Sequence, residues 1–342
     1  MSSHKTLRDL KSIPEGIKSL LDSMPKDLEK ISSLVEKEKP KNFILTGCGS
    51  SYYAALASSY AFKGLNVYVK PSGELSIYPH AVLNKGSLVI ILSRSGETTE
   101  VLRGLRAAKK IGCTTIALTY SPKSSLAEEA DLTVTVDVGP EDGLLMTKTF
   151  SGLTIAGTLV GLALSAREDL IEEAGNLPEA AKETLTRGEK AARSLAERIT
   201  EDPRCLFCLG EGPSYPAAME GALKFMEGAE FPAQGIHGME FRHGSKVIAY
   251  KSRLIIFALA GEAFKEMLKL AEDAEKWGAD VILITNRDIE NFSSLRVYWR
   301  GDELLTPSIS TPLLHLTAYF VAVSKGINPD RPRNLSRFIK LE

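Results

Sequence analysis

Hydrophobic and polar residues follow two different periods along this chain. From Leu20 to Val35 apolar side chains recur at three- and four-residue spacing, which is the period of a helix with one buried face. Pro40 ends the pattern, because proline cannot continue a helix interior. Residues 1–39 are therefore predicted to form an amphipathic helical arm.

After the arm the pattern changes to short apolar runs separated by helix-like segments. Strands that alternate with helical crossovers form a parallel sheet whose two faces are both covered by helices. The first half of the chain is therefore predicted to contain an α/β domain. Its predicted strands are 43–45, 67–69, 88–92, 115–118 and 132–136.

An internal repeat indicates that the second half copies the first. The segment PKNFILTGCGSSYYAA starts at residue 40, and PRCLFCLGEGPSYPAA starts at residue 203 with both glycines in register. Two later pairs of segments match in the same order and at nearly the same separation, so the sequence predicts two copies of one domain. The matching pairs are 40–55 with 203–218, 88–97 with 253–262, and 109–119 with 275–285.

The predicted fold is α/β, with two tandem flavodoxin-like domains of three α/β/α layers, each containing a mostly parallel sheet, and an N-terminal helical arm. A stretch rich in alanine, glutamate and arginine between the two copies predicts a helical connector. The predicted organisation is an arm at 1–39, a first domain at 40–176, a connector at 177–202, a second domain at 203–328 and a C-terminal tail at 329–342.

The charge balance argues against one class of partner. Of 342 residues, 42 are basic and 43 are acidic, so the formal net charge is −1. A surface that binds nucleic acid needs a concentrated basic field, and the sequence contains none. Nucleic acid is therefore not expected as a partner.

Cysteine content and hydropathy indicate a cytoplasmic protein. Four cysteines are too few for a disulfide framework in a chain of this length, which fits a reducing compartment. The first twenty residues contain no apolar core of a signal peptide. The longest apolar stretch, 152–166, is too short and too rich in glycine to span a bilayer, so no membrane partner is expected.

Two loops of the first domain have the composition of a phosphate site. Residues 47–51 (GCGSS) and 93–98 (SRSGET) each follow a predicted strand and precede a predicted helix. Ligands of parallel sheets bind at the carboxyl ends of the strands, where helix N-termini offer unpaired N–H groups. Glycine permits close backbone approach, and hydroxyl groups donate to anion oxygens. The loops therefore predict a site for an anion the size of a phosphate monoester.

The spacing of glycines in these loops does not match the common nucleotide-binding motifs. A dinucleotide fingerprint needs a third glycine where Tyr52 stands, and the Gly-Lys-Ser/Thr of a nucleoside triphosphate loop is absent. Ser51 and Ser95 can instead merely cap helices. The second copy, however, reads ALA at 258–260 where the first reads SRS at 93–95. Loss of these polar groups from one copy favours a ligand on the first domain.

The helix-like segment 217–227 carries three charges among small and apolar residues. Glu220, Lys224 and Glu227 are separated by four and three residues, which places them on one helix face. A surface ion pair is the simplest interpretation. The flanking alanine, glycine, methionine and phenylalanine residues are not typical of a solvated face, so we favour a cleft in which these groups transfer a proton.

The histidines and cysteines differ in their surroundings. His243 lies in a charged segment bounded by glycines, which makes it a catalytic candidate, although a lone histidine is usually structural. His315 lies in an apolar helix-like run and is predicted to be packed, and His237 is intermediate. Cys205 and Cys208 fall in an apolar strand pattern and are predicted to be core residues. Because no cluster has metal-ligand spacing, neither a metal nor another cofactor is expected.

As an ordered set, these motifs resemble the sugar isomerase (SIS) domain family. The similarity is to the isomerase half of glucosamine-6-phosphate synthase and to stand-alone phosphosugar isomerases and glucosamine-6-phosphate deaminases of the SIS type, and it extends from Pro40 to the C-terminus. The matching motifs are GCGSS (47–51), SRSGET (93–98), TKTF (147–150), EGALKFME (220–227), EFRHG (240–244) and RPRNLSR (331–337).

The resemblance implies a role for each matching residue. Glu227 matches the base that moves a proton between C1 and C2 of the sugar, with Glu220 and Lys224 as polar neighbours. His243 matches the group that opens the sugar ring from a neighbouring subunit, which implies a homodimer with a shared active site. The residues implied to bind a phosphorylated hexose or amino sugar are Cys48, Gly49, Ser50, Ser51, Ser93, Arg94, Ser95, Thr98 and, in a tail that closes the site, Arg337.

Several departures from the synthase pattern bear on the reaction. The synthases begin with a glutaminase domain whose cysteine follows the initiator Met, but here Ser2 follows Met1, so glutamine is not expected to be the ammonia donor. Arg337 stands where the synthases carry a Schiff-base lysine, and a guanidinium group is a poor imine former; Lys340 is nearby but out of register. Arg94 adds a charged donor where the synthases have a neutral amide.

The resemblance and these departures predict a glucosamine-6-phosphate deaminase, which converts glucosamine 6-phosphate and water to fructose 6-phosphate and ammonia. A simple phosphosugar isomerase without nitrogen chemistry is the first alternative. A non-catalytic phosphosugar-binding regulator is the second. Retention of Lys224, Glu227 and His243 argues against a regulator, and the arm is too short for a helix-turn-helix domain.

Overall fold

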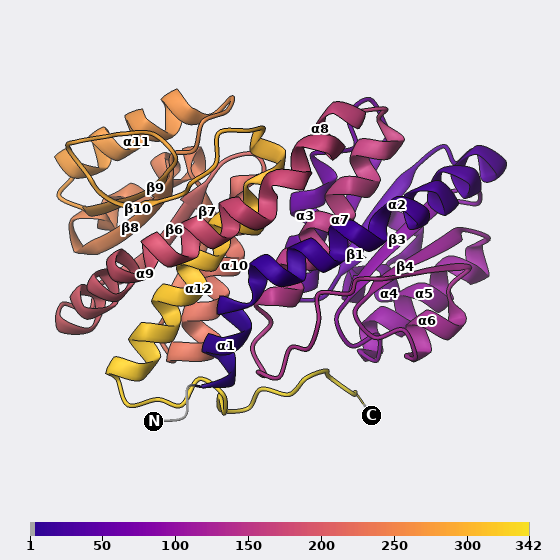
Figure 1. Ribbon diagram of the computed structural model, residues 1–342, viewed down its shortest axis with the longest axis horizontal. Coiled ribbons are helices and arrows are strands. Elements are labelled where there is room, and N and C mark those ends of the chain that lie inside the picture. The colour runs from indigo at the N-terminus through magenta and orange to yellow at the C-terminus, as the bar shows by residue number, and fades with distance from the viewer. Residues whose placement is uncertain (1–3, 342) are drawn as a thin grey trace. The chain divides into compact units, whose positions relative to one another are not determined.

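The computed structural model describes residues 4–341, which divide into two compact units with one parallel sheet each (Figure 1). The first-sheet unit comprises residues 15–141, 148–175 and 336–341. The second-sheet unit comprises 4–14, 142–147 and 176–335. The fold is therefore the predicted pair of α/β domains with helices at the N-terminus.

Five parallel strands form the first sheet in the order β2-β1-β3-β4-β5. The five predicted strands are confirmed, and their bounds differ from the predicted ones by at most two residues. The strands are β1 (Phe43–Gly47), β2 (Val67–Pro71), β3 (Leu88–Ser93), β4 (Thr114–Thr119) and β5 (Leu132–Thr135).

Helices cover both faces of the first sheet (Figure 1), which explains why its central strands are apolar at successive positions. On one face, Ile44 and Val89 of the strands pack against α4, α5 and α6, with Leu105 of α5 in the same apolar cluster. Helices α3 and α7 pack on the other face. The helices are α2 (Ile13–Glu38), α3 (Ser50–Ser59), α4 (Ser72–Ile77), α5 (Thr99–Ile111), α6 (Ser125–Glu129), α7 (Lys148–Leu164) and α8 (Glu168–Glu173), with 3-10 turns η1 (Pro79–Ala81) and η2 (Ala174–Asn176).

The second sheet is also parallel, in the order β7-β6-β8-β9-β10. Its strands are β6 (Cys205–Gly210), β7 (Ala233–His237), β8 (Ser252–Phe257), β9 (Asp280–Thr285) and β10 (Ser293–Arg296). Its helices are α1 (Lys5–Lys11), α9 (Leu177–Glu201), α10 (Ser214–Ala229), α11 (Phe264–Lys276) and α12 (Pro307–Ser324), with 3-10 segments η3 (Met239–His243), η4 (Ser245–Lys251) and η5 (Glu303–Leu305).

The two sheets share one strand order, so the predicted duplication is confirmed at the level of topology. The paired glycines also adopt matching conformations. Gly49 and Gly212 both have a φ of 53°, a left-handed conformation that favours glycine. A Cβ on Gly47 would lie 2.6 Å from the carbonyl carbon of Ser51, and a Cβ on Gly210 would overlap the carbonyl oxygen of Ser214 still more closely. In both copies glycine therefore lets the helix start directly against the strand end.

The predicted helical arm consists of two helices. α1 ends at Lys11 and α2 begins at Ile13, and Pro14 lies in the first turn of α2, where proline is preferred. Of the predicted apolar positions, Leu20 and Ile31 are buried in α2. Residues 1–3 of the predicted arm lie outside the described residues.

The structure also tests the predictions for the two cysteines of β6 and for the apolar stretch 152–166. Cys208 is buried as predicted, but Cys205 is exposed, so its assignment to the core is wrong. Residues three apart on a strand face opposite sides, and Cys205 is the first residue of β6. The apolar stretch at 152–166 forms most of α7 and is largely buried. Within residues 4–341, no helix combines the length and apolar character needed to cross a bilayer.

The close approach at Gly47 makes a stability prediction. Gly47→Ala should lower the free energy of unfolding by about 1–3 kcal/mol, because the new methyl group would overlap the first turn of α3. Gly175→Ala is the matched control, since a Cβ there meets nothing within 4 Å. Urea unfolding of both variants checks the prediction, and equal unfolding free energies would contradict it.

Candidate functional site

The two predicted phosphate loops start from neighbouring strands at one edge of the first sheet. One loop (47–51) follows β1 and the other (93–98) follows β3, and these strands are paired in parallel. The chain moves from β1 outward to β2 and from β3 outward to β4, so the two loops flank the point where the strand order reverses. In doubly wound sheets this point forms a ligand crevice.

The hydroxyl groups of the second loop accept hydrogen bonds from their own turn. Oγ of Ser93 accepts from the backbone N of Gly96 at 3.0 Å, and Oγ of Ser95 accepts from N of Glu97 at 3.2 Å. Each hydroxyl still carries a proton that it can donate to an anion. Gly96 has a φ of 65°, and a Cβ there would overlap Oγ of Ser124, so this turn requires glycine.

The remaining predicted phosphate ligands lie where the two helices begin. Gly49 immediately precedes α3, and Ser50 and Ser51 occupy the first turn of that helix, where both are buried. Thr98 is the residue before α5, and its side chain does not cap the helix. The structure thus places these residues at two helix N-termini, where the helix dipole favours a negative charge.

Cys48 is packed differently from its neighbours. Burial raises the pKa of its thiol to about 11, and the nearby Glu100 carboxylate acts in the same direction. The side chain packs against the apolar cluster of Ile44, Leu75 and Leu105. Cys48 is therefore a protonated thiol at neutral pH and is not an activated nucleophile.

Arg94 is anchored by a buried carboxylate. Its Nη1 lies 3.4 Å from Oε2 of Glu141, whose side chain has no exposed area. The same carboxylate accepts the backbone N of Thr149 at 3.0 Å and its Oγ1 at 2.5 Å. Arg337 of the tail donates to the backbone oxygen of Glu141 at 2.8 Å. Glu141, which carries no predicted role, thus fixes both arginines.

The C-terminal tail runs over the N-terminus of α5. The backbone N of Thr99 donates to the carbonyl oxygen of Ile339 at 3.1 Å, and N of Leu341 donates to Oγ1 of Thr99 at 3.0 Å. These bonds hold the tail within the first-sheet unit beside the predicted phosphate loop. No sequence motif indicated this pairing.

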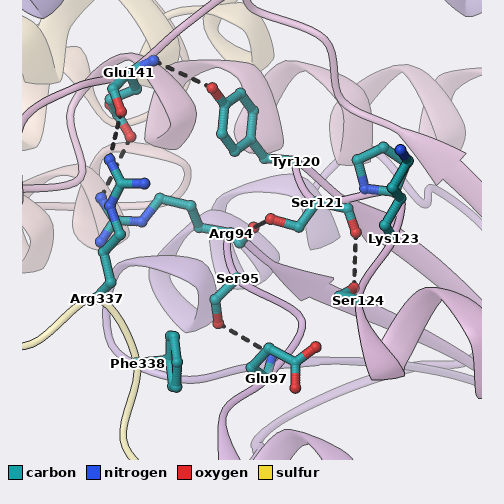
Figure 2. Close-up of a pocket in the computed structure, with 11 residues that line it drawn as sticks. Arg94, Ser95, Glu97, Tyr120, Ser121, Lys123, Ser124, Glu141, Arg337 and Phe338 are labelled. Atoms are coloured by element: carbon teal, nitrogen blue, oxygen red, sulfur yellow. Dashed lines mark hydrogen bonds and ion pairs between the residues drawn. The ribbon is translucent and has the colours of Figure 1, made fainter.

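A cavity of about 520 Å³ lies beside the second loop, and Figure 2 shows the side chains that surround it. It brings three of the predicted site residues together, namely Arg94, Ser95 and Arg337. The other lining residues are Glu97, Tyr120, Ser121, Pro122, Lys123, Ser124, Glu141 and Phe338. None of the residues of the first loop lines this cavity.

The second-sheet unit holds the predicted acid/base residues as one buried cluster. On α10, Nζ of Lys224 lies 2.8 Å from Oε1 of Glu220 and 2.8 Å from Oε2 of Glu227. The side chains of Glu220 and Lys224 are 0% and 1% exposed, whereas that of Glu227 is 20% exposed. Glu227 is therefore the member of the cluster that a substrate can reach.

Mutual attraction keeps this cluster charged. Burial opposes the charge of Lys224, but Glu220 and Glu227 outweigh it, so the pKa of the ammonium group is raised. Burial likewise opposes ionisation of Glu220, but Lys224 and His315 together outweigh it and the pKa of the carboxyl group is lowered. At neutral pH a buried carboxylate and a buried ammonium group thus stand behind Glu227.

His315 completes the cluster, although only its burial was predicted. It is buried on α12 as expected, yet its Nε2 lies 3.3 Å from Oε1 of Glu220, the oxygen that also contacts Lys224. Burial lowers the pKa of the imidazole, although Glu220 acts in the opposite direction, so His315 is neutral at neutral pH. A histidine in an otherwise apolar helix is the sequence signal that could have indicated a buried polar contact.

Two further histidines of the second-sheet unit lie near the end of β7. His243 ends the segment η3 and is exposed. His237 stacks on the ring of Tyr215 with centroids 3.5 Å apart, and its Nδ1 lies 3.4 Å from Oε2 of Glu211. Glu211 also accepts the backbone N of Met239 at 2.8 Å and so fixes the start of η3.

The neutral, buried state of His315 predicts a pH dependence of stability. The pKa of a histidine in an unfolded chain is about 6.5, and the pKa of His315 in the folded protein is lower. As the pH falls through the unfolded pKa, protons therefore bind preferentially to the unfolded chain. The wild type should therefore lose unfolding free energy relative to His315→Gln as the pH falls from about 7.5 to about 5.5.

Chemical denaturation at several pH values measures this difference. His80→Gln is the control, because His80 is exposed and lies outside the cluster. A difference between wild type and His315→Gln that does not change with pH would show that His315 does not titrate in this way.

Comparison with known proteins identifies the family independently of this geometry. A model of the SIS domain matches residues 38–163 and 201–322. The glutamine–fructose-6-phosphate aminotransferase (isomerizing) of Pyrococcus horikoshii is 31% identical over 354 residues, which cover 99% of this chain but 58% of that protein. The corresponding protein of Sulfurisphaera tokodaii is 29% identical over 340 residues, 99% of this chain and 57% of that protein. The chain thus spans less than two thirds of these relatives.

Solved structures share the whole fold. The C-terminal domain of glucosamine-fructose-6-phosphate aminotransferase from Francisella tularensis has a TM-score of 0.88 at 24% identity, covering 96% of this chain and 98% of that one. The glucosamine-6-phosphate deaminase of Thermotoga maritima has a TM-score of 0.82 at 26% identity, covering 98% and 100%. Because the family model covers both sheets and their main helices, this chain belongs to the SIS domain family.

Proposed function

We propose that this protein is a glucosamine-6-phosphate deaminase, which converts glucosamine 6-phosphate and water to fructose 6-phosphate and ammonia. The observation that carries the proposal is the buried ion cluster on α10, in which Lys224 holds the partly accessible carboxyl group of Glu227. The Thermotoga maritima deaminase, which the chain matches over its full length, supports the choice within the family.

The phosphate of the substrate binds at the two serine-rich loops in this proposal. Ser51, Ser93 and Ser95 lie at the reversal point of the first sheet, where hydroxyl protons and helix N-termini favour an oxyanion. Ser50, Thr98 and the backbone of Gly49 complete the set. Binding a group remote from the reacting carbons positions the sugar for reaction. The packing of Cys48 gives it a role in shaping the loop rather than in chemistry.

Glu227 acts as the base that moves a proton between neighbouring carbons. It removes the proton from C2 of the open-chain amino sugar, which gives an enolamine, and returns a proton to C1. The resulting imine at C2 takes up water and releases ammonia, leaving the ketone of fructose 6-phosphate. Lys224 holds the Glu227 carboxylate in place, and Glu220 keeps Lys224 charged.

His243 opens the sugar ring in this proposal. It is exposed at the end of η3, and the family resemblance implies that it serves the active site of a neighbouring subunit. The protein is accordingly proposed to act as a homodimer, with each site completed by its partner. Size-exclusion chromatography with light scattering tests the dimer directly.

Arg337 distinguishes this proposal from synthase chemistry. A guanidinium group stays protonated and does not form an imine, so no Schiff base with the ketose is expected at this position. Arg337 instead closes the site by its bond to the backbone of Glu141. Water rather than a protein amine then completes the exchange at C2.

A phosphosugar isomerase without nitrogen chemistry is the second candidate. The same base moves the same proton when C2 carries a hydroxyl group, because removal of the C2 proton does not require an amino group. A non-catalytic regulator is not supported, since a ligand-binding role alone does not require a buried charged cluster behind Glu227.

Replacement of the base tests the mechanism. Glu227→Gln should lower kcat by about a hundredfold or more, because the amide cannot accept the C2 proton, while binding of the phosphosugar changes little. Glu266→Gln on α11 is the matched control, since Glu266 is an exposed helical glutamate of the same unit. Deuterium incorporation from solvent at C2 is the readout, and unchanged incorporation in Glu227→Gln would remove this residue from the mechanism.

The products separate the two candidate reactions. With glucosamine 6-phosphate we expect ammonia and fructose 6-phosphate in equal amounts, measured by enzymatic assays of both. Glucose 6-phosphate in the same assay is the comparison substrate. Ketose formed from glucose 6-phosphate, with no ammonia from the amino sugar, would identify an isomerase instead.

A further inference from the structure

The cavity beside the second loop shares Arg94 and Ser95 with the predicted phosphate site, but no residue of the first loop lines it. The phosphate loops follow β1 and β3, whereas the cavity is lined by residues that follow β3 and β4, together with Glu141 and the tail (Figure 2). A volume of about 520 Å³ is in the range of pockets that hold small organic molecules. The proposed deaminase reaction uses Ser95 and Arg337 of this lining but gives no role to Tyr120, Lys123 or Phe338.

Two hydroxyl groups around the cavity are available as donors. Tyr120 accepts a hydrogen bond from the backbone N of Glu141 at 3.2 Å, so its own proton is free to point elsewhere. Oγ of Ser95 accepts a hydrogen bond from N of Glu97, so its hydroxyl proton is also free to be donated. Ser121 differs, because its proton is already donated to the carbonyl oxygen of Arg94 at 2.9 Å.

The carboxylates of the cavity are already engaged by the protein. Both oxygens of Glu97 accept from Ser125, one from its backbone N at 2.8 Å and one from its Oγ at 3.0 Å. Glu141 accepts from Thr149 and faces Arg94. Neither carboxylate therefore needs a cation from a ligand.

The remaining cations have no carboxylate partner. Within residues 4–341, Lys123 makes no hydrogen bond or ion pair, and the only hydrogen bond of Arg337 is to the backbone oxygen of Glu141. Counting Arg94, Lys123 and Arg337 against Glu97 and Glu141, the cavity carries one excess positive charge. Pro122 and Phe338 add apolar surface to this lining.

We propose that this cavity is a second anion site, which binds a small organic molecule bearing a phosphate or carboxylate group next to an apolar face. Lys123, Arg337 and the hydroxyl of Tyr120 hold the oxyanion, and Pro122 and Phe338 contact the apolar part. Charge-assisted hydrogen bonds of this kind are the strong ones in proteins. The oxyanion belongs either to a second acidic group on the sugar phosphate or to a separate molecule.

Phenyl phosphate is the probe for this site, because it joins an oxyanion to an apolar ring. Calorimetric titration is carried out on Glu227→Gln saturated with glucosamine 6-phosphate, so that the serine loops are filled and no turnover occurs. Phenyl phosphate should still bind, and adding Lys123→Ala should weaken it about tenfold or more. Lys123→Arg should restore binding.

Two controls keep the result specific. Lys63→Ala removes an exposed lysine of the same unit and should leave binding unchanged. Tyr120→Phe should weaken phenyl phosphate without altering turnover of glucosamine 6-phosphate by the otherwise unmodified protein. If glucosamine 6-phosphate displaces phenyl phosphate completely and Lys123→Ala has no effect, the probe binds only at the serine loops and the proposal is wrong.

Fructose 1,6-bisphosphate distinguishes the two sources of the anion. If the second acidic group belongs to the substrate, Lys123→Ala weakens the bisphosphate about tenfold and leaves fructose 6-phosphate unchanged. If the ligand is separate, Lys123→Ala affects phenyl phosphate alone. Ser51→Ala with Ser93→Ala should weaken glucosamine 6-phosphate but not phenyl phosphate, so failure of the proposed reaction and failure of this site give different results.

Discussion

An ammonium group cannot remain charged away from water unless carboxylates surround it, and this constraint organises the second-sheet unit. Removing an ion from water costs several kcal/mol even after relaxation of the protein. Lys224 meets the condition with one carboxylate on each side, a turn before it and a turn after it on α10. Its position therefore fixes the carboxylate of Glu227, and the closure of the cluster by α12 brings His315 against Glu220.

Local sequence patterns were sufficient for features that one segment determines. The strands follow from apolar runs, and contact between Glu220, Lys224 and Glu227 follows from helical spacing. His315 could be predicted to be buried but not to touch Glu220, because that contact depends on how α12 packs on α10. Propensity and period describe one element at a time, so they cannot supply a contact between two.

Contacts between distant segments were likewise unpredictable in the first-sheet unit. Motifs marked Ser93, Arg94 and Ser95, but nothing marked Glu141, which reaches Arg94 only because the chain returns to this edge after β5. Lys123 and Tyr120 entered the site through the loop after β4, which carries no motif. The packing of Cys48 also lay outside what the motif could give, because its contact with the apolar cluster under α4 and α5 depends on how those helices pack.

The two copies differ in which of them carries the serine-rich loop 93–98 and which carries the charged helix α10, and their packing explains this difference. The repeat aligns Ala57 and Ala61 of the first copy with Glu220 and Lys224 of the second. In the first copy α3 packs closely on α7, since Ser58 donates to the carbonyl oxygen of Thr154 and a Cβ on Gly161 would overlap Phe62. Such close packing leaves no volume for long charged side chains.

The second copy has the opposite arrangement, with a charged helix and an apolar loop. There α10 has room for the ion cluster opposite His315, and the loop that would correspond to SRSGET is apolar at Ala258 and Leu259, both buried. A buried apolar loop end offers no side-chain donors to an anion, so the second copy does not repeat the predicted phosphate site. The first copy therefore combines tightly packed helices with a polar loop, and the second combines a charged helix with an apolar loop. Duplication allowed these two combinations to occur in separate sheets.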